Sequence, residues 1–243
     1  MSRHGKQYTT ARAAIDRETA YSPVEAVRKL KAFPAAKFDE TVEVHFRLGL
    51  NVRHADEQLR GTLMLPHGTG KDVRIAVFAE GDKAREAQEA GADVVGSADL
   101  AKRIEEGFTD FDVAIATPDQ MGTVGKLGRI LGPRGLMPNP KTGTVTNDIS
   151  KAVADVKGGR IEYRADRTGI VHLIIGKKSF EERALLENYL AVVDEVLKAK
   201  PSSAKGRYIR SITLATTMGP GIHVDPTRIR DIVEEAQEAV ATG

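Results

Sequence analysis

Residues 73–118 of this chain read VRIAVFAEGDKAREAQEAGADVVGSADLAKRIEEGFTDFDVAIATP. Short apolar runs alternate here with charged segments that favour helix; the runs lie at 73–78, 94–95 and 113–116, and the charged segments at 82–90 and 99–106. Strands that alternate with helices are typical of a mostly parallel sheet with helices on both faces. With a further helix expected at 147–157, the middle of the chain predicts a small, doubly wound, Rossmann-like α/β domain.

The segment after this pattern combines a helix-start signal with an unusual charge distribution. Thr117-Pro118-Asp119-Gln120 has the spacing of a capping box. Residues 120–147 contain no acidic residue, six glycines, three prolines and four cations, which are Lys126, Arg129, Arg134 and Lys141. Glycine lets the backbone approach a partner closely and proline fixes φ, so we expect an extended basic loop that contacts RNA or phosphate. A solvated surface loop fits the same residues equally well.

The two ends of the chain are patterned differently, with amphipathic strands and longer helices. Ser22-Pro23-Val24-Glu25 is a capping box with proline at the first helical position, and it predicts a helix that ends near residue 33. Residues 41–48 alternate strictly between apolar and polar, as in a strand with one buried face. Further elements are expected as a hairpin of 160–164 with 170–175 across 166–169, a helix capped at 179–182, a strand at 208–215, and a last helix from 225 that includes Ile229, Ile232, Val233, Ala236 and Val240.

Neither end is large enough for a comfortable core of its own, so we expect the ends to fold together. The predicted fold class is α/β with two domains. Residues 1–67 plus 159–243 form a discontinuous α+β domain, and residues 68–158 are inserted into it. A linear run of three small units is the alternative. The glycines at the two joints, Gly68, Gly70, Gly158 and Gly159, are candidates for a hinge.

Charge is spread unevenly over this division. Residues 1–66 carry a net +3 and residues 159–230 a net +5, whereas residues 67–158 carry −2 and the last thirteen residues −4. A domain built from the two ends, without the acidic tail, is therefore basic, as expected of a protein that binds a polyanion. The same excess of Lys and Arg could simply keep the surface soluble, but the asymmetry favours a nucleic-acid partner.

Composition and failed motifs exclude several other classes of protein. The chain has 243 residues, 41% of them hydrophobic and 29% charged, with no cysteine. It contains no apolar run that could span a membrane and no apolar signal segment at its start, so we expect a cytoplasmic protein without membrane contact. Gly68-Thr69-Gly70-Lys71 fails as a P-loop, because Leu65 and Asp72 occupy the positions of a glycine and a Ser or Thr. The six histidines lack metal-ligand spacing, and we expect no metal, no cofactor and no catalysis.

Two segments carry a family resemblance. GKLGRILGPRGLMPNP at 125–140 and VADVKGGRIEYRADRTGIVHLIIGK at 153–177 closely resemble the bacterial L-one family of large-subunit ribosomal proteins. The segments at 37–41 and 216–220 stand where that family has its RNA-contacting strips. The resemblance extends in the right order from about Tyr8 to Ala236, whereas the acidic end of the chain from Asp231 is unlike the family core.

The resemblance implies a discontinuous first domain that binds a bent helical element of large-subunit rRNA, forming the mobile stalk beside the tRNA exit site. It further implies help in releasing deacylated tRNA, and repression of translation through the protein's own operon mRNA. The implied partners are thus rRNA within the cytoplasmic ribosome, exit-site tRNA and that mRNA, with a monomer outside the ribosome. By resemblance, the residues that line the RNA surface are Lys37, Phe38, Thr41, Glu43, Ser211, Thr217, Met218 and Gly219, with Arg164 and Arg167 nearby.

These residue types suit RNA on chemical grounds as well. Folded RNA displays 2′-hydroxyls and backbone in shallow surfaces and bends, where Thr and Ser hydroxyls can both donate and accept. Phe38 and Met218 can pack against a sugar or an unstacked base, and the basic side chains position phosphates without reading sequence. Taken singly, Phe38 and Met218 would be expected in a core. Two other classes of protein stay open: an enzyme whose inserted domain binds a nucleotide, and an RNA regulator or chaperone that works outside the ribosome.

Overall fold

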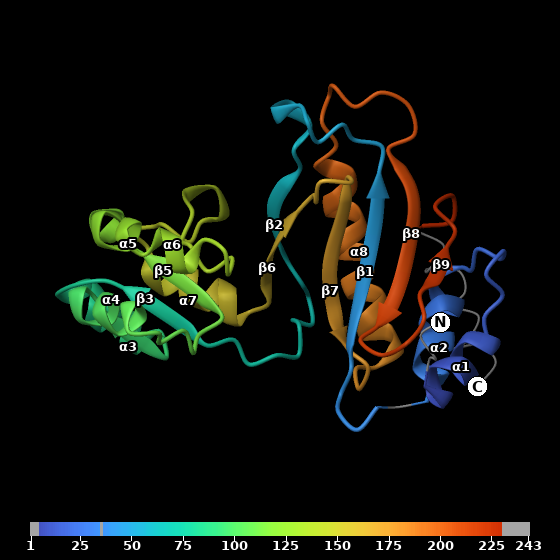
Figure 1. Cartoon of the computed structure of the whole chain (residues 1–243), viewed down its shortest axis with the longest axis horizontal. Helices are drawn as coiled ribbons and strands as arrows, with labels where there is room; N and C mark the ends of the chain where they lie inside the picture. Colours follow the sequence, from blue (N-terminus) through green and yellow to red (C-terminus); the bar gives the residue numbers. More distant parts are fainter. Residues whose placement is uncertain (1–4, 35, 230–243) are drawn as a thin grey trace. The chain divides into compact units, whose positions relative to one another are not determined.

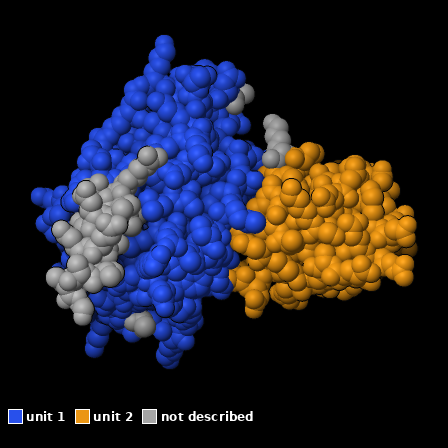
Figure 2. All heavy atoms as spheres, turned by 180° about the vertical axis from the view of Figure 1, so that it is seen from behind, with its two compact units in different colours: residues 1–70, 161–243 blue, residues 71–160 orange. Residues whose placement is uncertain are grey.

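The computed structural model describes residues 5–34 and 36–229 and divides the chain into two compact units. Unit 1 comprises residues 1–70 and 161–243, and unit 2 comprises residues 71–160; they are coloured separately in Figure 2. The division expected from the sequence, at 67/68 and 158/159, lies within three residues of these boundaries. Each unit has hydrophobic clusters of its own.

Unit 1 is built on a four-stranded antiparallel sheet in the order β7-β1-β8-β9 (Figure 1). Its strands are β7 (Ile170–Lys177), β1 (Thr41–Leu48), β8 (Ile209–Thr216) and β9 (Ile222–Val224). The alternation expected for β1 is confirmed: its even-numbered apolar side chains, Val42, Val44, Phe46 and Leu48, are all buried. Because β1 pairs with a strand on each side, its polar side chains lie in the middle of the opposite face of the sheet.

Two helices cover the buried face of this sheet. These are α2 (Pro23–Ala32) and α8 (Glu182–Lys198), and α8 runs behind the sheet in the view of Figure 1. The capping box of α2 is confirmed, since Ser22 and Glu25 each bond the other's backbone. The predicted cap of α8 is wrong: Glu181 stands at its N-cap without a side-chain bond, and Ser179 instead donates to Asp39. A short helix, α1 (Lys6–Ala13), precedes α2.

The hairpin expected between 160–164 and 170–175 is also wrong. β6 (Arg160–Arg164) pairs with β2 (Arg60–Met64) in a separate two-stranded sheet. Its link to β7 is confined to the turn, where Ala165 forms a bridge with Val171 and the Asp166 N–H donates to the Ile170 carbonyl at 2.8 Å. Tyr163 is buried, and its hydroxyl donates to Glu195 of α8 at 3.0 Å. The chain thus changes sheets at this turn, a choice fixed by tertiary contacts rather than by the strand pattern. The turn η1 (Ala55–Glu57) precedes β2.

Unit 2 is the doubly wound α/β unit that the sequence predicts. Its parallel sheet has the order β4-β3-β5, formed by β4 (Val94–Gly96), β3 (Ile75–Phe78) and β5 (Val113–Ala116). Ile75 and Val77 pack with α3 (Asp82–Glu89) and α7 (Ile149–Lys157). Ala76 and Phe78 face the other way, toward α4 (Ala98–Glu105), α5 (Met121–Lys126) and α6 (Gly128–Leu131).

The expected extended loop at 120–147 is wrong, because its first part is helical. α5 and α6 lie within it, followed by the single turn η3 (Pro140–Thr142). Val124, Leu127 and Leu131, spaced as on one helix face, are fully buried in the core of unit 2. The capping box at Thr117 is wrong as well, since Thr117 makes no side-chain cap and η2 (Pro118–Gln120) follows it. Apolar spacing outweighed the glycines in setting the local structure.

Two expectations concern the ends of the chain. The predicted last helix falls largely on residues from 230 onward, which lie outside the described residues, as does the acidic tail. Among residues 5–34 and 36–229, no helix is both long enough and apolar enough to cross a membrane.

Candidate nucleic-acid interface

The uncovered face of the unit 1 sheet is mostly polar, although the exposed Ile174 also lies on it opposite Glu43. On β1 it carries Glu43, His45 and Arg47, which alternate with the buried residues. Register partners on neighbouring strands point to the same side of a sheet, so this face also carries Ser211 opposite Arg47, Thr213 and His172 opposite His45, and Ala215 opposite Glu43. All of these side chains are exposed or half-exposed. The face therefore offers hydroxyls, imidazoles and a carboxylate side by side.

At one end of this face, two segments far apart in the sequence are joined. The Thr217 N–H donates to the Thr41 carbonyl at 3.1 Å, and the Thr41 N–H donates to Thr217 Oγ1 at 3.0 Å. Lys177 Nζ donates to Thr41 Oγ1 at 2.9 Å. We call the joined segments, residues 36–41 and 216–219, the rim. The structure thus brings together Thr41 and Thr217, which the sequence predicted for one site.

The rim exposes two large apolar side chains. Phe38 is 53% exposed and Met218 61% exposed, although both residue types are usually buried. Lys37 beside them is exposed as well. Exposed apolar groups next to hydroxyls and a cation suit a partner with both flat faces and negative charge, as RNA has.

Gly219 closes the turn of the rim. Its N–H donates to the Thr216 carbonyl at 3.2 Å. A Cβ at this position would overlap Thr216 Oγ1 and come within 3.3 Å of the Phe33 ring. The close approach that glycine permits here is therefore made to the protein itself, and it lets the 216–219 turn fold tightly beside residue 41.

Glu40 is the buried residue of the rim, and sequence reasoning did not single it out. Only 2% of its surface is exposed. Burial raises its pKa, but the N–H groups of Met218 and Ala36 and the charge of Lys178 lower it more, so the pKa of this carboxyl falls below its usual range. The sequence contains a pattern that predicts this burial. Glu40 precedes Val42 and Val44 with the same period of two, which places it on the buried side of the strand.

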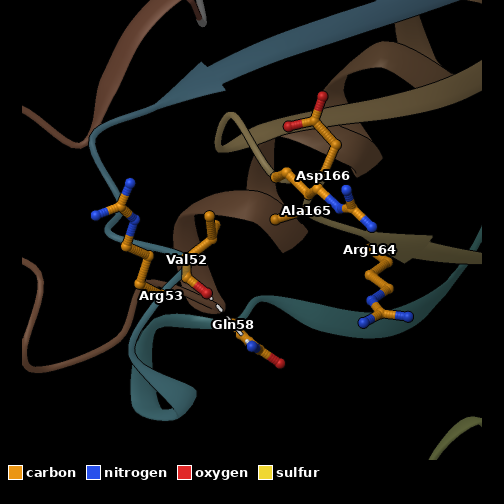
Figure 3. Close-up of a pocket in the computed structure, with 7 residues that line it drawn as sticks. Val52, Arg53, Gln58, Arg164, Ala165 and Asp166 are labelled. Atoms are coloured by element: carbon orange, nitrogen blue, oxygen red, sulfur yellow. Dashed lines mark hydrogen bonds between the residues drawn. The ribbon is translucent and has the colours of Figure 1, made fainter.

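At the opposite end of the face lies a pocket with three arginines (Figure 3). Its volume is about 380 Å³, and its lining includes Arg53, Gln58, Arg164 and Arg167. Gln58 Nε2 donates to the Val52 carbonyl at 3.3 Å. Sequence reasoning proposed Arg164 and Arg167 but missed Arg53 and Gln58, because only the folded chain brings the β1–β2 connection beside the β6–β7 turn.

The pocket and the rim are separate features of the face. Thr41 pairs with Lys177, whereas Arg47 pairs with Ile170, next to the pocket turn. The six residue steps from Thr41 to Arg47 span roughly 20 Å along the strand. Ser211, opposite Arg47, belongs to the pocket end. The predicted RNA-contacting residues are thus distributed over both ends of one sheet face rather than gathered in a single strip.

Two histidines and two carboxylates connect the ends. His45 and His172 face each other with 2.9 Å between their Nδ1 atoms, and their other ring nitrogens lie 3.7 Å from Glu43 and 3.5 Å from Asp166. Burial and the neighbouring His172 lower the pKa of His45. Burial raises the pKa of Asp166, but hydrogen bonds from Ile170, Thr168 and His172 bring it down to about 2. The middle of the face therefore offers imidazole and carboxylate groups, which suit hydroxyls better than phosphates.

The remaining predicted site residues lie elsewhere. Lys126 on α5 and Arg129 on α6 are exposed, Arg134 donates to Thr109 Oγ1, and Lys141 lies in η3, so these four cations belong to unit 2. Of the joint glycines, Gly68, Gly70 and Gly159 have positive φ, whereas Gly158 has φ −72° at the end of α7. Their role as a hinge stays a prediction. Among the described residues, no group of three or more His, Asp or Glu side chains could hold a metal ion.

Comparison with known proteins gives a consistent picture. The model of the ribosomal protein L1p/L10e family matches residues 30–220. The chain is 62% identical over 234 residues to large ribosomal subunit protein uL1 of Thermobifida fusca, covering 96% of this chain and all of that one. It is 58% identical over 237 residues to the uL1 protein of Frankia alni, and 56% identical over 239 residues to that of Rhodococcus erythropolis; both alignments cover 98% of this chain and all of the relative.

Proposed function

The chain belongs to the ribosomal protein L1p/L10e family, and from this membership we propose that it binds large-subunit rRNA through unit 1. It thereby forms the mobile stalk beside the tRNA exit site. Its relatives are ribosomal proteins rather than enzymes, so the role is structural and is carried out in the ribosome. The observation that carries the proposal is the rim, where two distant segments present Phe38, Met218 and the Thr41–Thr217 pair on one edge of a polar sheet face.

The two ends of the face contact different parts of the RNA. The rim supplies hydroxyls and apolar side chains, which contact riboses and unstacked bases at an RNA bend. The arginine pocket supplies guanidinium groups that hold phosphates and fix the register of the RNA on the sheet. Between the two ends, Glu43 accepts hydrogen bonds from 2′-hydroxyls, and the two histidines donate to 2′-hydroxyls or accept from them. Thus RNA shape is recognised at the rim, and charge at the pocket.

Two further roles belong to this proposal. The stalk assists the release of deacylated tRNA at the exit site. The same sheet face also binds the protein's own operon mRNA, so that rRNA and mRNA compete for it and free protein represses translation. Both roles are expectations from the family, and the second requires the RNA surface of unit 1 to be accessible on the free protein.

The salt dependence of binding tests how many phosphates are held. We expect the logarithm of the association constant for rRNA to fall linearly with the logarithm of the salt concentration, with roughly −0.7 to −0.9 per phosphate contact. Lys37, Arg53, Arg164 and Arg167 would together give a slope of about −3. Fluorescence titrations at several salt concentrations measure this slope. A flat response would rule out phosphate contacts by these side chains.

A sedimentation experiment separates this function from the alternative of an RNA regulator outside the ribosome. The protein is expected to sediment with large subunits from a cell extract and to stay with them at physiological salt. Protein that remains in the supernatant while binding free RNA would favour the regulator instead.

A further inference from the structure

We propose that Glu40 is the positioning residue of the rim, holding its two segments in the conformation that RNA recognises before RNA binds. The inference rests on the proposed RNA-binding function of this face. With 2% of its surface exposed, Glu40 cannot contact RNA itself. Any effect of this carboxylate on binding must therefore pass through the residues that it holds.

Glu40 uses both carboxylate oxygens to tie the rim together. Oε1 accepts from the Ala36 N–H at 3.2 Å, and Oε2 accepts from the Met218 N–H at 3.0 Å. One oxygen thus holds the segment that leads to Phe38, and the other holds Met218, whose apolar side chain is 61% exposed. Hydrogen bonds from backbone N–H groups to a buried carboxylate are directional and stronger than bonds between neutral groups.

A third contact fixes the carboxylate itself. The Glu40 carbonyl accepts from the Lys178 N–H at 2.8 Å, and Lys178 Nζ lies 3.8 Å from Oε1. Lys178 Nζ also donates to the Phe33 carbonyl at 2.8 Å, so the cation is held at the start of the same loop. The buried negative charge is therefore compensated, and its position is determined by three chain segments rather than by one.

These contacts require a carboxylate at its full length. Glutamine would keep the size but place an NH₂ group against one of the two N–H donors, which leaves that donor without an acceptor. Aspartate would keep the charge near Lys178 but lacks one methylene, so it cannot reach both donors. The two variants should therefore loosen the rim to different degrees without altering any RNA-contacting side chain.

Binding of a large-subunit rRNA hairpin to full-length Glu40→Gln, Glu40→Asp and wild-type protein tests this role. Leu63→Ala, a buried truncation on β2 away from the rim, serves as a control for lost stability. All proteins are compared at a temperature where circular dichroism shows them folded. We expect about 30-fold weaker binding for Glu40→Gln, about fivefold for Glu40→Asp, and less than twofold for Leu63→Ala.

A second readout needs no RNA. In the free protein, the Met218 amide should exchange its hydrogen at least tenfold faster in Glu40→Gln than in wild type, and at an unchanged rate in Leu63→Ala. Wild-type affinity in Glu40→Gln, or an equal loss in Leu63→Ala, would overturn the positioning role alone. A wild-type protein that binds a scrambled hairpin as tightly as the cognate one would overturn the proposed function, and this inference with it.

Discussion

Replacing Met218 with aspartate is expected to weaken binding of the rRNA hairpin by about 100-fold while leaving the protein folded. Met218 is 61% exposed, so an acidic side chain there meets water in the free protein and costs little stability. In the complex it would remove an apolar contact and set a negative charge against the RNA backbone, and like charges at an interface cost several kcal/mol. Isothermal titration of both proteins with the same hairpin measures the difference.

Met64→Asp is the matched control for this experiment. Met64 is 50% exposed on β2, and the substitution makes the same change of charge at a position away from the rim. We expect it to change affinity by no more than about threefold, through long-range electrostatics alone. Equal losses in the two variants would mean that net charge, and not the rim, determines affinity. Thr217→Ala is less suitable, because the Thr217 hydroxyl also closes the sheet at Thr41.

The largest effect on stability is expected for Asn188→Ala. Asn188 is fully buried; its Oδ1 accepts from the His67 N–H at 3.0 Å, and its Nδ2 donates to the carbonyls of Gly68 and Ile175 at 3.0 and 2.8 Å. Alanine would leave these three backbone groups without their partner, at a cost of about 3 kcal/mol in the free energy of unfolding. Urea unfolding followed by circular dichroism measures it.

An exposed asparagine provides the comparison. The Asn51 side chain accepts a hydrogen bond from the Arg53 N–H at 3.3 Å, and it is exposed to water. Asn51→Ala should cost less than about 1 kcal/mol. A similar small loss for Asn188→Ala would show that water replaces its three bonds. The contacts of Asn188 also concern the proposed hinge. They hold His67 and Gly68 against α8, so any bending at this joint would occur in the residues after Gly68.

Features with a strong local signal were predictable from the sequence. β1 has a strict period of two, α2 has a complete capping box, and unit 2 alternates short apolar runs with helical segments; all three are present as expected. At 120–147, however, the abundance of glycine and proline led to the prediction of a loop. The spacing of three apolar residues determined the structure instead. Val124, Leu127 and Leu131 are buried on one side of α5 and α6, and the glycines between them tolerate the helix.

Features set by tertiary contacts were not predictable in this way. β6 pairs with β2 instead of β7, and in this arrangement Tyr163 is buried and donates to Glu195, a contact that the local strand pattern does not reveal. Similarly, the distance between the rim and the arginine pocket follows from the register of β1 with β7. Family resemblance named the surface residues. The period of two predicts that Glu40 is buried, but its bond to Met218 and the place of Arg53 in the pocket are seen only in the folded chain.

The central claim is that one face of unit 1 recognises folded rRNA by shape as well as by charge. Its most direct test is a titration of the full-length protein with a large-subunit rRNA hairpin and with a scrambled hairpin of equal length and charge, in the same buffer at physiological salt. We predict at least 100-fold tighter binding of the cognate hairpin. Equal affinities for the two hairpins would contradict the claim.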